Sequence, residues 1–194
     1  MAQCACWRFV VAIVVASFLA SCASPAAIVS GDPLRLAGGS STGSGVSGLA
    51  PGTTVTWSVD IADDASEPAV IDAYELVGLS RGLSVVGAAG MSEGPGLAPP
   101  VTGPATDFMR SAVGARSLVG WSFHPAVDGA LRQWVVFLIS TGSAGNYPVN
   151  SIVLRYHVGT QRFESQLPAS LQLCVGATAP EAGTCPLPAA STAP

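Results

Sequence analysis

The chain has 194 residues, a length that suits one globular domain with terminal extensions. Only 10% of the residues are charged, and 12 acidic side chains face 8 basic ones, all of them arginine. This acidic balance argues against nucleic-acid binding and against electrostatic docking on anionic lipid, because both require a basic surface. The low charge content favours crowded β-structure over an exposed helical surface.

The N-terminal segment carries an apolar run. Residues 9–20 contain no charged side chain, and Arg8 precedes them. The run fits the apolar core of a signal peptide, which has about 7–15 residues, and falls short of the roughly 20 residues that span a bilayer. Small residues Ala20 and Ser21 follow it. The pattern predicts a signal peptide over residues 1–21 and export of the rest.

The residues that close this run are Leu19, Ala20, Ser21 and Cys22. This motif resembles the lipobox of bacterial prolipoproteins, which reads Leu, a small residue, Gly/Ala/Ser and Cys. The resemblance implies that Cys22 receives a diacylglyceryl thioether, becomes the mature N-terminus and carries palmitate-type acyl chains. Two or three such chains hold a domain stably on a membrane, here the extracytoplasmic face of the cell membrane. The alternatives are an ordinary secretory signal, cut after Ala20 or Ala23, and an uncleaved anchor.

The cysteines divide by position. Cys4 and Cys6 leave with the signal peptide, and Cys22 is the lipid site, so Cys174 and Cys185 remain. An even pair in an exported chain predicts a structural disulfide, worth about 2–3 kcal/mol for so short a loop. A redox or metal-binding pair is disfavoured because the C-x-x-C spacing is lacking.

Residues 22–52 are predicted to be the lipidated cysteine and a flexible tether, because Gly, Ser and Pro fill 16 of the 30 positions from 23 to 52. Such a chain spans roughly 30 Å on average. Residues 33–36 are a candidate edge strand within it. Residues 39–43 match G-x-S-x-G and residues 43–48 match G-x-G-x-x-G, but neither has the flanking strand and helix that these sites need.

The next segments alternate apolar and polar residues, as strands with one buried face do. The clearest case is 54–61, where Val55, Trp57, Val59 and Ile61 share a face. In residues 118–123 the pattern likewise places Val119, Trp121 and Phe123 on one face. Strands are expected over 54–61, 69–79, 83–86, 118–123, 132–139, 151–158, 162–166 and 171–175.

A long segment, 87–117, is rich in Gly and Pro and is predicted to be a crossover between two sheets. Its middle, 106–110, is apolar enough to dock, and no helix is expected there. Residues 140–148 are expected to be a connecting turn.

Seven or eight short strands over residues 53–178, without a convincing helix, favour an all-β fold, an antiparallel immunoglobulin-like β-sandwich. The hairpin at 151–167 and the domain size resemble immunoglobulin-like lipoproteins of actinobacteria, and this likeness implies the same sandwich. Residues 179–194 are predicted to be a C-terminal tail.

Two histidines, His124 and His157, are the candidate metal ligands, with Met91 and Met109 as possible partners. A blue-copper site needs two His, a Cys and usually a Met in a tight cluster, and the positions of these residues along the sequence do not form such a cluster. We therefore predict no metal site and no cofactor.

Four acidic residues, Asp60, Asp63, Asp64 and Glu67, gather near one turn. Calcium prefers such oxygen ligands, but the EF-hand spacing is absent, so a solvated turn is favoured.

The sequence therefore favours a membrane-anchored, non-enzymatic module on the extracytoplasmic side, with an envelope protein or glycan as partner. The alternative is a surface protein that handles copper or zinc through His124 and His157. A third hypothesis is a hydrolase accessory subunit.

Overall fold

The computed structural model describes residues 28–30, 33–37, 42–93, 100–125 and 132–176. Within these residues it contains thirteen strands and one short helix. In chain order they are β1 (Ile28–Ser30), β2 (Leu34–Leu36), β3 (Thr42–Leu49), β4 (Thr54–Asp63), β5 (Ala69–Val77), β6 (Leu83–Ser92), β7 (Gly103–Pro104), α1 (Asp107–Gly114), β8 (Ser122–Phe123), β9 (Gln133–Thr141), β10 (Gly145–Val149), β11 (Ser151–Val158), β12 (Gln161–Leu167) and β13 (Ala169–Val175).

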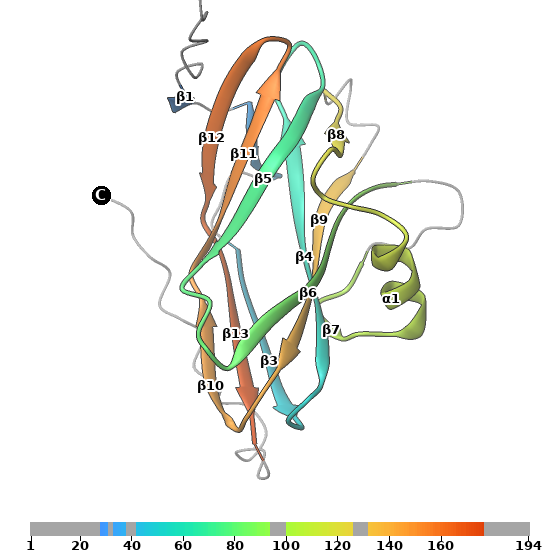
Figure 1. The fold of residues 1–194 in the computed structure, drawn as a ribbon, viewed down its shortest axis with the longest axis vertical. Helices are drawn as coiled ribbons and strands as arrows, with labels where there is room; N and C mark the ends of the chain where they lie inside the picture. The colour runs from blue at the N-terminus through green and yellow to red at the C-terminus, as the bar shows by residue number, and fades with distance from the viewer. Residues whose placement is uncertain (1–27, 31–32, 38–41, 94–99, 126–131, 177–194) are drawn as a thin grey trace, which may run out of the picture.

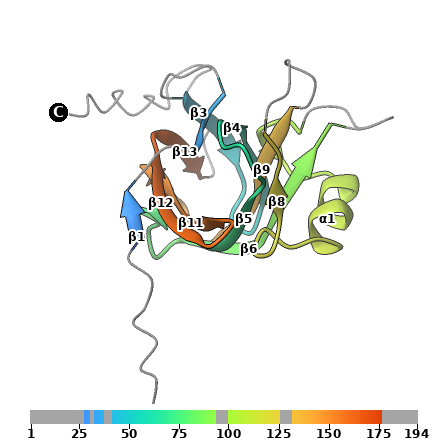
Figure 2. The same ribbon diagram turned by 90° about the horizontal axis from the view of Figure 1, so that it is seen from above.

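The strands form two layers (Figure 1). One layer is the sheet β2–β4–β9–β6, and β7 pairs with the edge of β4. The other layer is built on a long hairpin in which β11 pairs with β12 and β10 pairs with β13. On this hairpin, β5 and β8 extend the β11 side, whereas β1 and β3 lie in parallel beside β12 and β13. Figure 2 shows the two layers curving around a shared interior.

The strand order identifies the type of sandwich. The sheet β2–β4–β9–β6 corresponds to the four-stranded ABED sheet of an immunoglobulin constant-type domain, and β5–β11–β12 corresponds to its CFG sheet. The parallel pairing of β3 with β13 is an addition to that order. The prediction of an all-β, immunoglobulin-like sandwich is therefore confirmed.

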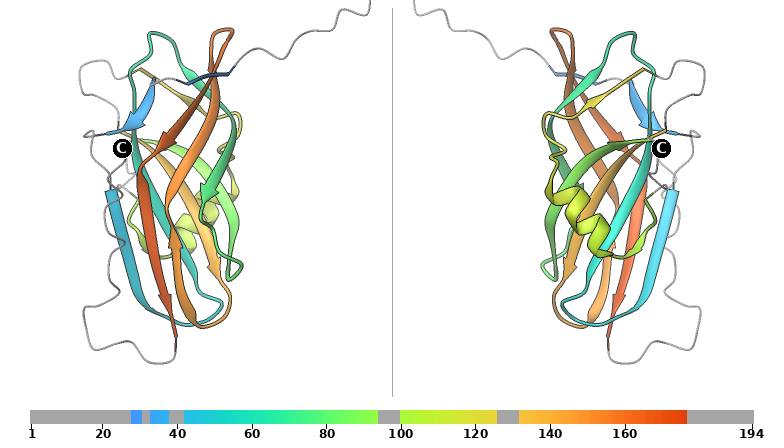
Figure 3. Two further views of the ribbon diagram at one scale, coloured as in Figure 1. Left: turned by 90° about the vertical axis from the view of Figure 1, so that its left-hand side faces the viewer. Right: turned by 90° about the vertical axis from the view of Figure 1, so that its right-hand side faces the viewer.

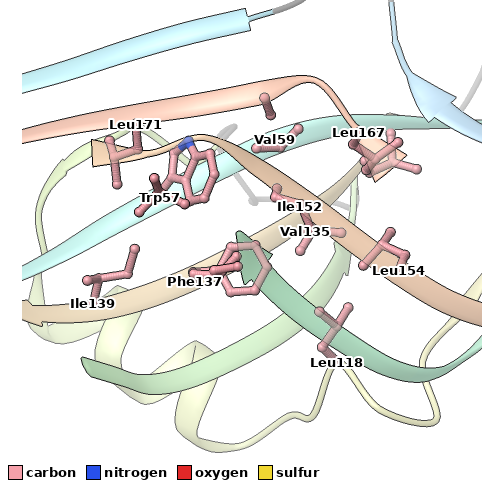
Figure 4. Close-up of a cluster of buried hydrophobic side chains, with 14 of the residues drawn as sticks. Trp57, Val59, Leu118, Val135, Phe137, Ile139, Ile152, Leu154, Leu167 and Leu171 are labelled. Carbon is pink, nitrogen blue, oxygen red and sulfur yellow. The ribbon is translucent and has the colours of Figure 1, made fainter. Parts of the chain in front are cut away.

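The core between the layers follows from the alternation in the strands. Trp57 on β4 and Phe137 on β9 are buried, and their ring centroids lie 5.6 Å apart. From the opposite layer Ile152, Leu154 and Leu171 point into the same space (Figure 4). Outside β9, each of these side chains alternates with a more polar or more exposed neighbour on its strand, so the face that carries them is the one removed from water.

A second, smaller core lies on the outer face of the β6–β9 sheet. Met109 and Val113 of α1 pack there with Met91, Trp134 and Val136. This explains why β9 is apolar on both faces, since one face meets the main core and the other meets the helix. Figure 3 shows α1 lying against this sheet.

The expectation that residues 87–117 hold no helix is wrong. Thr106 caps α1, and its Oγ1 accepts a hydrogen bond from the backbone N–H of Met109 at 3.2 Å. The helix has only eight residues, so its apolar stripe amounts to Met109 and Val113 and is too short to stand out as a periodic pattern.

The sandwich also begins earlier in the chain than the sequence indicates. β1 and β3 lie within the range predicted as a tether, and each pairs with a strand of the domain. The candidate edge strand at 33–36 is confirmed as β2, which pairs with β4. The composition of β3, TGSGVSGL, gives no sign of a strand, because glycine is depleted in strands and the Gly and Ser residues give no apolar alternation. Backbone hydrogen bonds to β13, rather than side-chain burial alone, fix its place.

Other strand boundaries also differ from those predicted. β6 continues to Ser92, and β10 occupies part of the expected turn at 140–148. In the segment 118–123 only Ser122 and Phe123 form a strand. Val119 is 48% exposed whereas Phe123 is buried, so the predicted common face of Val119, Trp121 and Phe123 is wrong. The chain crosses between layers here, and Leu118 N–H donates to Ala88 O at 2.9 Å.

Tyr147 marks the corner between β9 and β10. Its hydroxyl donates to the backbone oxygen of Ser143 at 2.8 Å, four residues upstream. A tyrosine at the start of strand F that bonds back in this way is the tyrosine corner of immunoglobulin-like domains. The ring lies directly on Gly82, where a Cβ would come within 2.2 Å of Tyr147 Cε1. Glycine at 82 is thus required by this close approach.

We expect Tyr147→Phe to lower the free energy of unfolding by about 1 kcal/mol, because it removes the hydroxyl bond but keeps the ring. Urea unfolding followed by tryptophan fluorescence measures the change. Tyr74→Phe is the matched control, since the Tyr74 ring packs 5.5 Å from Phe137. An equal loss in both variants would contradict a specific role for the Tyr147 hydroxyl.

Candidate functional site

A group of charged side chains joined by three ion pairs lies on the outer face of β5, β11 and β12. We call the side chains of Asp72, Glu75, Arg155, His157 and Glu164 the charged face. They arise from the same alternation that builds the core. On β11 the buried Leu154 and Tyr156 alternate with Arg155 and His157, so these two project outward.

The hairpin register brings these charges together. Arg155 lies opposite Glu164 on β12 and opposite Ala73 on β5. Its Nε donates to Glu164 Oε2 at 2.7 Å, and its Nη2 lies 3.8 Å from Glu75 Oε2. The Arg155 side chain is 43% exposed, so these pairs are solvent-screened and each contributes at most about 1 kcal/mol.

His157 belongs to the same face. Its Nδ1 lies 2.9 Å from Asp72 Oδ1, within hydrogen-bond distance. The charged face therefore holds both signs of charge, partly exposed and aligned by a rigid hairpin. Such side chains can exchange their mutual pairs for pairs with a polar or charged partner.

The acidic residues at the β4–β5 turn have separate roles. Asp60 pairs with Arg132 and Asp64 pairs with Arg35. Asp63 is only 1% exposed, and its carboxylate accepts hydrogen bonds from the backbone N–H groups of Ala65 and Ala69 at 2.9 and 3.3 Å. This cluster thus shapes the turn, and only part of it is solvated: the predicted solvated turn holds for Asp64 but not for Asp63.

Burial raises the pKa of Asp63 above its ordinary value, and the two backbone hydrogen bonds oppose this shift only in part. The folded state therefore holds this proton more tightly than the unfolded state does. The stability contributed is full below the unfolded carboxyl pKa of about 3.9 and is lost as pH rises through the higher folded pKa.

We expect the unfolding free energy of the wild type, relative to D63N, to fall as pH is raised from about 3.5 to about 7. The amide of D63N does not titrate, so the difference isolates Asp63. Urea unfolding of both proteins across this range measures it. A difference that stays constant or rises with pH would contradict the raised pKa.

The candidate metal ligands lie in different environments. His157 is paired with Asp72. His124 lies just beyond β8, where the side chain of Gln133 accepts a hydrogen bond from the backbone N–H of His124 and donates one to its backbone carbonyl. Met91 and Met109 are buried beneath α1. Among the described residues, no three His, Cys, Asp or Glu side chains lie close enough together to hold a metal ion.

The predicted lipid site, Cys22, lies outside the described residues, and so do the other lipobox residues Leu19, Ala20 and Ser21. Cys174 lies on β13 and projects away from the buried Leu173 and Val175. Cys185 is also outside the described residues, so the disulfide stays a prediction. In the part of the chain that the structure describes, no helix has the length and apolarity to cross a membrane.

One feature of the charged face had a usable signal in the sequence. The turn Gly159–Thr160 fixes the hairpin register, and alternation from it places Arg155 opposite Glu164.

Comparison with known proteins leaves the family open. No protein-family model matches the chain, and no curated protein matches it. Two chains among solved structures match, and one of them is described as the structure of the Vibrio cholerae VesB protease. The match has a TM-score of 0.40 and 10% identity, and it covers 74% of this chain and 32% of that chain. The chain thus spans about a third of the structure it matches, and the likeness carries no conclusion about family or activity.

Proposed function

We propose that this chain is a bacterial lipoprotein anchored to the cell membrane through Cys22, with a non-enzymatic sandwich that acts as an interaction module outside the cytoplasm. The observation that carries the proposal is the motif Leu19-Ala20-Ser21-Cys22 at the end of an apolar run of signal-peptide length. Two or three acyl chains on Cys22 provide stable membrane attachment without any membrane-binding face on the domain.

The charged face is the proposed contact surface, and an envelope protein is the proposed partner. The charged face carries charges of both signs, held in register by the β11–β12 hairpin, and such a face suits a protein surface with the complementary pattern of charges. A neutral glycan offers hydroxyl groups but no charge to pair with Arg155 or Glu164, so a protein is favoured over a glycan.

The anchor is tested by the intact mass of the protein purified from the membrane fraction. The expected mass is that of residues 22–194 plus acyl chains, increasing by two protons on reduction if the Cys174–Cys185 bridge is present. An unlipidated protein in the medium would overturn the anchor and identify an ordinary secreted protein.

The contact surface is tested by capture of detergent-solubilised envelope proteins on the immobilised mature protein. We expect a specific partner to be retained by the wild type and reduced at least tenfold by Arg155→Glu. Arg110→Glu is the matched control, because Arg110 is exposed on α1, away from the charged face. Equal retention by both variants would exclude the charged face. The urea midpoint of each variant shows whether it is folded.

A further inference from the structure

We infer that one end of the sandwich faces the lipid surface: the end formed by the β4–β5 turn and the β11–β12 turn. We call residues 64–68 and 158–162 the anchor end. The inference rests on the proposed lipidation of Cys22 and adds an orientation to it, with a membrane surface as the partner of this end.

The first step is where the chain enters the domain. β1 runs parallel to β12, with Ile28 opposite Arg162 and Ser30 opposite Glu164. Arg162 is the second residue after the turn at Gly159 and Thr160. Ile28 therefore lies beside the tip of the long hairpin, as the label β1 beside the upper part of β12 shows (Figure 1).

The second step is the reach of the connecting chain. Only residues 23–27 separate Cys22 from β1. Six residue steps extend to at most about 20 Å. The hairpin strand that runs from β10 through β11, residues 145–158, has a length of about 45 Å at the usual rise per residue. The anchor end is thus within reach of the bilayer, and the opposite end lies more than twice that distance away along the sandwich.

The opposite end is defined by two other connections. The β3–β4 turn around Ala50 and the β9–β10 turn meet there, where Gly52 N–H donates to Thr141 O at 2.8 Å. β13 also finishes at this end, since Gly176 N–H donates to Leu49 O. The last described residue, Gly176, therefore lies at the end of the sandwich opposite the anchor end.

The anchor end has the surface expected for polar contact with headgroups. Glu67, Gly159, Thr160 and Arg162 are exposed there. The large exposed apolar side chains of the described residues lie elsewhere, namely Val86, Val101, Phe108 and Val119. The end therefore rests on the headgroups without inserting, and the strands of the charged face run away from the membrane, leaving that face open to the side.

The test uses the full-length precursor, processed in a bacterial host and reconstituted into phosphatidylethanolamine–phosphatidylglycerol vesicles. An encoded azide-bearing residue replaces Thr160 in one protein and Ala50 in the matched control, and each is coupled to a donor dye. Both positions are exposed turn residues, at opposite ends of the sandwich. Energy transfer to an acceptor on the lipid headgroup reports proximity to the bilayer.

We expect transfer from position 160 to be at least twofold more efficient than from position 50. Equal or reversed efficiencies in vesicle-bound protein would overturn the orientation and leave the anchor standing. Protein that lacks acyl chains and does not float with the vesicles would overturn both proposals.

A second experiment tests whether the short connection between Cys22 and β1 causes this orientation. Twenty Gly and Ser residues inserted between Ala26 and Ala27 lengthen the connection without altering β1. We expect the two transfer efficiencies to converge in this variant, because the longer chain permits many orientations. A preference that survives the insertion would show that the anchor end binds lipid by itself, and would overturn chain length as the cause.

Discussion

Phe137→Ala is expected to lower the free energy of unfolding by about 3–5 kcal/mol, the range for removing a buried aromatic ring. Phe137 is fully buried on β9, and its ring lies between Trp57 at 5.6 Å and Tyr74 at 5.5 Å. Trp57 and Tyr74 come from opposite layers, so the cavity left by removal of the Phe137 ring would lie between the two sheets. Because small domains have only about 5–15 kcal/mol of stability, the variant should be marginally folded.

Urea unfolding of the mature protein, followed by tryptophan fluorescence, measures this effect. Phe108→Ala is the matched control, since it removes the same ring from a position that is 60% exposed on α1. A change within about 0.5 kcal/mol is expected there. Similar losses in both variants would show that Phe137 does not carry the main core.

The second large effect concerns Cys22. Cys22→Ala should reduce the incorporation of labelled palmitate to background, because the proposed lipid thioether would then have no sulfur on which to form. Cell labelling followed by immunoprecipitation measures this directly. It is preferable to fractionation, since an uncleaved signal peptide can hold the variant on the membrane by its apolar run.

Cys6→Ala is the control for that experiment. Cys6 lies in the predicted signal peptide, so its removal should leave palmitate incorporation unchanged. Label retained in Cys22→Ala would contradict the lipobox.

The sequence predicts the fold best where side chains decide it. Trp57, Val59 and Ile61 alternate strictly with polar residues, and β4 lies there as expected. In β3 the pairing depends on the backbone of a Gly- and Ser-rich segment, so composition indicated a tether where the structure has a strand. The helix was missed for the related reason that two apolar positions, Met109 and Val113, do not establish a period.

The site was predictable to a similar degree. Alternation places Arg155 and His157 on one face of β11, but the sequence does not show that Asp72 and Glu75 lie beside them, because β5 joins β11 from a distant part of the chain. The β-bulge between Arg155 and Tyr156 also shifts the register with β5, and simple counting does not reveal it. The burial of Asp63 had no local signal either, since an acidic turn is ordinarily solvated.

The parallel pairing of β1 with β12 and of β3 with β13 joins the beginning of the domain to its end. Contacts of such large sequence separation are formed late and make folding slow, in the range of milliseconds to seconds for all-β domains. A chain that crosses the membrane N-terminus first cannot complete the sandwich until β13 has emerged. On the proposed export, we therefore expect the intermediate to expose the unpaired edges of β3 and β11 to proteases and chaperones for as long as β12 and β13 are still in transit.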